Sequence, residues 1–176
     1  KDRRFLTALK PMEVELQARP IVKEMTQVAK LANVGPMAAV AGAIAEFLGR
    51  DLLRKGYKDI IIENGGDIFM VISKTRKMGI YTGKSKLWNK LYLEIKSKDT
   101  PLGVCTSSGT VGHSLSFGLA DAVTILSKNT SLAETLKSVL YPIYTIGRKG
   151  SQNIEITGME SKEISNHESL FYIKTV

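Results

Sequence analysis

The sequence predicts an α+β protein with a mainly antiparallel sheet. Two helical patterns come first, short strand patterns then follow in hairpin-like succession, and strand and helix do not alternate as they do in parallel sheets. The length of 176 residues suits one domain with a sizeable core, and 43% hydrophobic and 24% charged residues are ordinary for a globular protein. We therefore expect a single domain over residues 1–176.

The first third of the chain carries the helical patterns. Apolar residues recur at helical spacing over 21–32. The segment 36–55 is rich in small residues on nearly every face, which predicts a buried, closely packed helix. Asn33 is predicted to cap this helix, and Gly56 suits its end.

Short strands are predicted along most of the remaining chain. A helix over 132–140 interrupts them, with Asn129 before it as a cap and Pro142 after it as a stop. The predicted strands are 58–63, 68–73, 79–82, 91–95, 102–106, 120–126, 143–146, 154–157 and 170–176.

The formal charge of +8 is concentrated over 74–98, where eight basic residues accompany one acid, Glu94. This stretch either attracts an anion such as nucleic acid or forms a solvated outer face of strands. We favour the outer face, because no nucleic-acid-binding motif accompanies the charge.

Cysteine, histidine and hydropathy limit the class of protein. One cysteine cannot form an internal disulfide, which fits the cytoplasm. One Cys and two His exclude a metal site built of several such residues, whereas oxygen ligands for Mg²⁺ or Ca²⁺ remain open. The apolar run 34–45 is too short to span a bilayer and no signal peptide opens the chain, so we expect no membrane partner.

The sequence Asn-Gly-Gly-Asp at 64–67 lies between two predicted strands. Two glycines there suit an ordinary type I′ hairpin. They also allow backbone N–H groups to face a ligand, with Asn64 and Asp67 as polar contacts. The glycine patterns of Rossmann and P-loop phosphate sites are absent.

The stretch 103–121 packs six hydroxyl side chains, four glycines, Cys105 and His113 into a short segment. It is either an anion-binding loop or a glycine-rich hairpin whose hydroxyls satisfy its own backbone. Cys105, predicted at a strand end, is either a reactive thiolate or a small buried apolar residue. A hydrolase triad of Ser107 or Ser108, His113 and an aspartate is the less favoured interpretation, because the nucleophile-elbow motif is absent.

Three motifs, at 34–46, 63–68 and 103–123, together resemble an uncharacterised prokaryotic family related to the ApbE-like FAD:protein FMN transferases. The resemblance covers roughly residues 20–140. It implies a T-fold-like α+β domain with FAD in a cleft. In the transferases, FAD and a divalent metal allow FMN to be moved onto a threonine of a target protein, with release of AMP. The transferases also have a longer N-terminal part, which we expect this chain to lack in large measure.

The resemblance also implies site residues. Those expected to contact FAD are Asn64, Gly65, Gly66, Asp67, Thr106, Ser107, Ser108, Gly109 and Thr110. Cys105, His113 and Asp67 are the candidates for catalysis. The metal-binding Asp and Thr of the transferases, four residues apart, correspond best to Glu134 and Ser138, with Lys137 placing a positive charge nearby; Mg²⁺ is the expected ion.

Three functions follow as hypotheses. The first is a flavin- or dinucleotide-binding protein related to the FMN transferases, with a flavin or nucleotide as its small-molecule partner. The small-residue helix suits a contact between subunits of a homo-oligomer and an internal contact equally well. The second is a sulfur-transfer protein that carries a persulfide on Cys105 for the synthesis of thiol amino acids. The third is a binding or scaffold protein without catalysis.

Overall fold

The computed structural model describes residues 3–81, 92–108, 122–143 and 169–173. Its helices are α1 (Pro20–Leu31), α2 (Val40–Arg54) and α3 (Thr130–Ile143), with short 3-10 helices at Arg3–Leu6, Pro36–Ala39 and Ser97–Asp99. Its strands are β1 (Ile60–Asn64), β2 (Asp67–Val71), β3 (Arg76–Gly79), β4 (Tyr92–Ile95), β5 (Leu102–Ser108), β6 (Ala122–Ser127) and β7 (Ser169–Ile173).

The main sheet has five strands in the order β1-β2-β5-β6-β7, and every neighbouring pair is antiparallel. A separate hairpin joins β3 and β4, also antiparallel. The predicted α+β class with a mainly antiparallel sheet is therefore confirmed.

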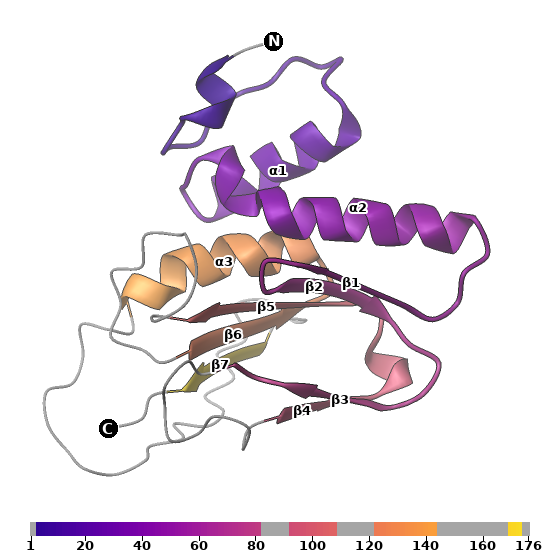
Figure 1. Cartoon of the computed structure of the whole chain (residues 1–176). Helices are drawn as coiled ribbons and strands as arrows, with labels where there is room; N and C mark the ends of the chain where they lie inside the picture. The colour runs from indigo at the N-terminus through magenta and orange to yellow at the C-terminus, as the bar shows by residue number, and fades with distance from the viewer. Residues whose placement is uncertain (1–2, 82–91, 109–121, 144–168, 174–176) are drawn as a thin grey trace, which may run out of the picture.

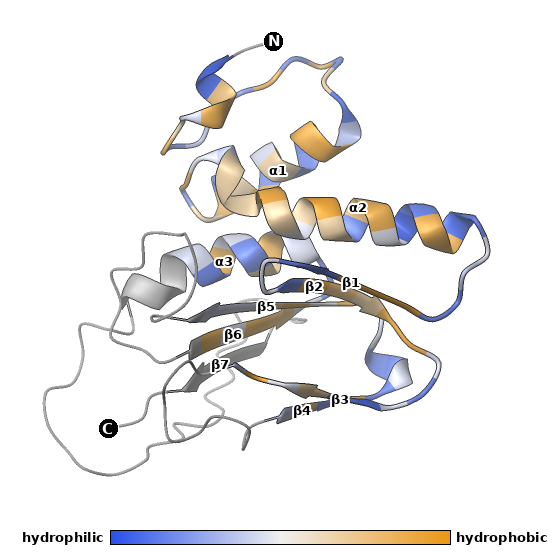
Figure 2. Ribbon diagram, viewed as in Figure 1, coloured by the Kyte–Doolittle hydropathy of each residue, from blue (hydrophilic) through white to orange (hydrophobic). Residues whose placement is uncertain are grey.

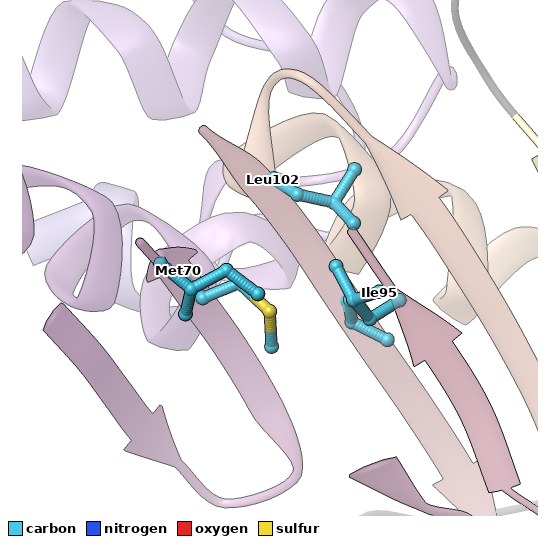
Figure 3. Packing of buried hydrophobic residues seen from close by; sticks show 5 residues of the cluster. Met70, Ile95 and Leu102 are labelled. Atoms are coloured by element: carbon cyan, nitrogen blue, oxygen red, sulfur yellow. The ribbon is translucent and has the colours of Figure 1, made fainter. Parts of the chain in front are cut away.

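The two faces of the main sheet carry different layers (Figure 1). Helices α2 and α3 cover one face, where Cys105, Val123, Ile125 and Ala133 form a core cluster. The β3–β4 hairpin covers the other face. Its core cluster, seen in Figure 3, consists of Met70, Ile72, Ile95, Leu102 and Val104. Because successive side chains of a strand point to opposite faces, Val104 and Cys105 belong to different cores.

Close packing explains the small residues before and within α2. A Cβ added at Gly42 would lie 2.6 Å from the Thr130 carbonyl oxygen of α3, and one added at Gly49 would lie 2.2 Å from the Phe69 ring of β2. The small-residue segment thus serves an internal contact. The sequence predicted that this segment is buried on nearly every side. That prediction is wrong, because Ile44 and Leu48 are 46% and 47% exposed. Figure 2 shows hydrophilic residues gathering at the C-terminal end of α2.

Two buried carboxylates join α2 to α3 reciprocally. The Thr130 N–H, at the first residue of α3, donates to Glu46 Oε2 of α2 over 2.7 Å. The Gly42 N–H, in the first turn of α2, donates to Glu134 Oε2 of α3 over 2.7 Å. Amides at helix starts lack partners within the helix and carry partial positive charge. Each carboxylate therefore accepts a hydrogen bond from such an amide of the other helix.

Several predicted boundaries differ from the structure. β5 continues to Ser108 because Thr106, Ser107 and Ser108 pair with β6, so Cys105 lies inside a strand and not at its end. β3 lies at Arg76–Gly79 and not at 79–82, because its pattern is too short and polar to be located by hydropathy. α3 passes Pro142 and ends at Ile143, which removes the start of the predicted strand 143–146.

The other differences concern helix starts. The predicted helix 36–55 is divided into a 3-10 turn and α2. Asn33, with φ of 56°, adopts the left-handed conformation and does not cap the next helix, whose N-cap is Gly35. The Leu132 N–H does donate to Asn129 Oδ1 over 2.8 Å, which confirms the predicted cap of α3. Gly56, with φ of 94°, follows α2 as predicted.

The described part of the basic stretch forms the exposed surface of the β3–β4 hairpin and its flanks. The exposed residues are Lys74, Arg76, Lys77, Lys96 and Lys98. Lys77 Nζ lies 4.7 Å from the centre of the Tyr92 ring, and Arg76 Nη2 lies 3.4 Å from Asp59 Oδ2. The described basic residues therefore lie on an exposed outer face of the hairpin.

Within the described ranges, no single helix has the length and hydropathy to cross a membrane. Only α1 taken together with the segment Pro36–Arg54 passes such a test, as a pair bent by 106°.

Candidate functional site

The fold brings together two of the segments singled out in the sequence. The 64–67 turn joins β1 to β2 with two left-handed glycines, Gly65 at φ 65° and Gly66 at φ 92°. The predicted two-residue hairpin is therefore confirmed. The Gly66 carbonyl accepts a hydrogen bond from the Thr106 N–H of β5 over 3.0 Å. We call this junction of the 64–67 turn with Thr106 and Ser107 the turn–β5 edge.

Several polar groups of the turn–β5 edge already have partners within the protein. The Gly66 N–H donates to Glu63 Oε1 over 2.8 Å, and the Asn64 side-chain amide donates to the Ala41 carbonyl over 3.2 Å. The Thr106 and Thr124 hydroxyls lie 3.0 Å apart. The Gly66 N–H and the Asn64 side chain, both expected to face a ligand, are thus used to fix the turn, whereas the hydroxyls of the half-buried Thr106 and Ser107 can still bond a ligand.

Behind this edge, on the helix-covered face, lies a buried polar cluster of Asp67, Cys105, Glu134 and Lys137. Asp67 and Cys105 are directly opposed on β2 and β5. Lys137 of α3 reaches back to Asp67, with 2.5 Å between Nζ and Oδ1 and only 12% and 3% of the two side chains exposed. The Cys105 thiol is fully buried and donates to the Thr130 carbonyl over 3.6 Å.

Burial dominates the protonation of this buried polar cluster. It raises the pKa of Asp67, against the opposing effect of the Lys137 ammonium. Burial first, and the neighbouring Asp67 charge second, raise the pKa of Glu134 to about 7. The pKa of Cys105 is raised well above its usual value, chiefly by burial and then by Asp67. A thiolate is therefore disfavoured at Cys105, which is the opposite of what sulfur transfer requires.

The residues present do not fit a divalent cation at Glu134 and Ser138. One Glu134 oxygen accepts the Gly42 N–H, and the exposed Ser138 hydroxyl donates over 3.2 Å to the backbone carbonyl of Glu134. The charged groups that act on Glu134 are the Asp67 carboxylate and the Lys137 ammonium. Among the described residues, no group of three or more His, Cys, Asp or Glu is arranged to hold a metal ion.

Other expected site residues are placed only in part. The Ser108 backbone pairs with Ala122 at the end of β5. Gly109, Thr110 and His113 lie outside the described residues, as does any triad built on His113. Sequence reasoning missed the Asp67–Lys137 ion pair and the role of Glu46. The spacing of Glu134 and Lys137, one helical turn apart, was a signal that both face the same side of α3.

Comparisons with known proteins show which proteins this chain is similar to. A family model described as "AbpE bacteria" matches residues 1–140. The chain is 40% identical over 172 residues to a UPF0280 protein of Methanobrevibacter smithii, covering 97% of this chain and 71% of the relative. It is 40% identical over 175 residues to one of Methanocaldococcus jannaschii, covering 98% and 70%.

Two solved structures also resemble the chain. The apo flavinyl transferase ApbE of Pseudomonas stutzeri superimposes with a TM-score of 0.47 at 16% identity, over 63% of this chain and 38% of that one. A variant of the flavin transferase ApbE from Vibrio cholerae gives a TM-score of 0.45 at 14% identity, over 82% and 49%.

Proposed function

The chain belongs to the family described as AbpE bacteria and to the UPF0280 proteins, and we propose that it binds FAD, or a related flavin or dinucleotide, at the turn–β5 edge. The observation that carries the proposal is the hydrogen bond from the Thr106 N–H to the Gly66 carbonyl. This bond joins two motifs, 40 positions apart in the sequence, that the resemblance expects to line one flavin site.

The chemistry of the turn–β5 edge supports a phosphate-bearing ligand. A Cβ added at Gly65 would meet nothing within 4 Å, so the outer side of the turn is open to an approaching molecule. Thr106 and Ser107 are half-buried and follow one another in β5, so their hydroxyls lie on opposite faces of the strand. Each hydroxyl can donate an O–H bond to a phosphate or ribose oxygen. Asp67, being buried, would position the turn through Lys137 and would not touch the ligand.

The proposal extends to a reaction of the transferase type. A threonine hydroxyl of a target protein would lose its proton and accept the FMN group from FAD, AMP would be the leaving group, and this chain would bind and orient FAD. Ser108, Gly109, Thr110 and His113 remain proposed contacts, on the resemblance alone. A non-catalytic flavin carrier is the competing role, and we propose the cytoplasm as the location of either.

Flavin fluorescence tests the site, with variants that separate binding from folding. Gly66→Val places a Cβ 3.0 Å from the Thr106 carbonyl at a φ of 92°, and Thr106→Val removes the hydroxyl at nearly constant volume. Gly56→Val is the matched control, because its φ of 94° carries the same backbone strain with nothing within 4 Å. We expect FAD affinity to fall about tenfold or more in the first two variants, equivalent to about 1.4 kcal/mol.

Equal FAD affinity in all three variants would overturn the site assignment. Analysis of the products for FMN and AMP then distinguishes the two roles, because a carrier binds FAD without releasing AMP.

A further inference from the structure

The family resemblance leads one to expect a divalent cation at Glu134 and Ser138, and the Lys137 ammonium lies among the buried carboxyl groups of Asp67 and Glu134. We infer that Lys137 is the resident cation of the Asp67–Glu134 carboxylate pair, and that this chain therefore takes up no divalent metal ion there. The inference concerns the occupancy of the buried polar cluster and does not depend on the proposed flavin binding.

The first support is the geometry of the ion pair. Lys137 Nζ lies 2.5 Å from Asp67 Oδ1, and both side chains are almost entirely removed from water. A metal ion bound to Asp67 would have to displace this ammonium, which would leave a buried positive charge without its carboxylate. Unpaired buried charges are strongly unfavourable, so the displacement opposes metal uptake.

The second support is the use of the remaining oxygen ligands. Glu134 Oε2 accepts the Gly42 N–H over 2.7 Å, and this bond belongs to the contact between α2 and α3. The Ser138 hydroxyl is turned onto its own helix backbone. A small divalent ion requires near-ideal octahedral geometry, so Glu134 and Ser138 alone do not hold it and Asp67, which Lys137 occupies, would have to contribute a ligand.

The third support is the balance of charge. The Lys137 ammonium lowers the pKa of Asp67 and of Glu134. The Asp67 charge raises the pKa of Glu134 and of Cys105, and the Glu134 charge raises that of Cys105. One fixed ammonium therefore performs the electrostatic task of a bound cation, without dependence on the metal concentration.

Mn²⁺ alone is the probe for the test, because its electron paramagnetic resonance signal reports the free ion. The full chain is compared with Lys137→Ala, with Lys137→Ala combined with Asp67→Asn, and with the control Lys128→Ala, which removes an exposed lysine that bonds the Asp99 carbonyl. We expect no saturable uptake by the wild type or the control at millimolar Mn²⁺. We expect Lys137→Ala to bind Mn²⁺ at least about tenfold more tightly, and the added Asp67→Asn to abolish this gain.

Saturable Mn²⁺ uptake by the wild type that Asp67→Asn removes would overturn the inference. So would a folded Lys137→Ala variant that binds no more Mn²⁺ than the wild type. Should Lys137→Ala fail to fold, Lys137→Gln carries the same prediction, because it keeps most of the side-chain length and loses the charge.

Discussion

Glu134 is a residue whose protonation state depends on its buried surroundings. It is 7% exposed, and burial with the Asp67 charge raises its pKa to about 7 from the ordinary value of 4.5. The folded protein therefore holds a proton on Glu134 over a pH range in which the unfolded chain has released it. Asp67, Cys105 and Lys137 are the ionisable groups that face it from β2, β5 and α3.

The sign of the resulting pH dependence is fixed by this raised pKa. Below pH 4.5 Glu134 is protonated in both the folded and the unfolded state and does not lower the unfolding free energy. Between pH 4.5 and about 7 the unfolding free energy falls, and above pH 7 this loss stays constant. We expect Glu134→Gln, which keeps an acceptor for the Gly42 N–H, to remove up to about 3 kcal/mol of the fall in unfolding free energy between pH 5 and pH 8. Urea unfolding at the two pH values measures it, and an unchanged pH dependence in the variant would contradict the raised pKa.

A substitution at Asp67 tests the energetic contribution of the buried ion pair. Asp67→Asn leaves the Lys137 ammonium buried without a carboxylate, so we expect a loss of about 3–5 kcal/mol in unfolding free energy. Asp59→Asn is the control, because it breaks the exposed pair with Arg76 and is expected to cost less than about 1 kcal/mol. Chemical denaturation of both variants at pH 7 compares them, and equal losses would show that burial of the Asp67 pair has no energetic effect.

At the scale of elements, the contact between α2 and α3 places Glu134 and Lys137 over the sheet. Gly42 allows this approach, since an added Cβ would lie 2.6 Å from the Thr130 carbonyl oxygen and 3.2 Å from the Glu134 Cβ. The two carboxylate-to-amide bonds of Glu46 and Glu134 then fix the relative position of the helices.

A substitution at Gly42 separates helix propensity from packing. Alanine is favoured over glycine within a helix by about 1 kcal/mol, so propensity alone predicts that Gly42→Ala stabilises the protein. The overlap with Thr130 predicts the opposite, a net loss of about 1–3 kcal/mol. Gly79→Ala in β3 is the control, because its added Cβ meets nothing within 4 Å and its effect should stay within about 0.5 kcal/mol. Thermal unfolding distinguishes the two, and a stabilised Gly42→Ala would refute the tight contact.

Sequence patterns located elements where one periodicity or one capping residue dominated. The helical spacing over 21–32 predicted α1, Asn129 predicted the start of α3, and two glycines predicted the β1–β2 turn. The sequence patterns failed where the pairing of strands decided the end of an element. The predicted strand stopped at Thr106, yet Ser107 and Ser108 belong to β5 because β6 provides partners for their backbone.

The whole molecule shows why the candidate site could be predicted only in part. The sequence indicated that the 64–67 turn and the hydroxyl-rich stretch act together, and the strand order places β2 beside β5. The ion pair of Asp67 with Lys137 joins positions 70 apart, and no local pattern encodes such a distance. Likewise, the raised pKa of Cys105 follows from burial by α3, which the residue's neighbours in sequence do not determine.

We propose that the turn–β5 edge binds a flavin and that the buried polar cluster makes a metal ion unnecessary there. The most direct test is a titration of the wild-type full chain with FAD in the presence of EDTA, followed by flavin fluorescence. We predict saturable binding whose affinity is unchanged when EDTA is replaced by Mg²⁺, because Lys137 already supplies the cation. Absence of saturable FAD binding under both conditions would contradict the proposed function, and binding that appears only with Mg²⁺ would contradict the role of Lys137.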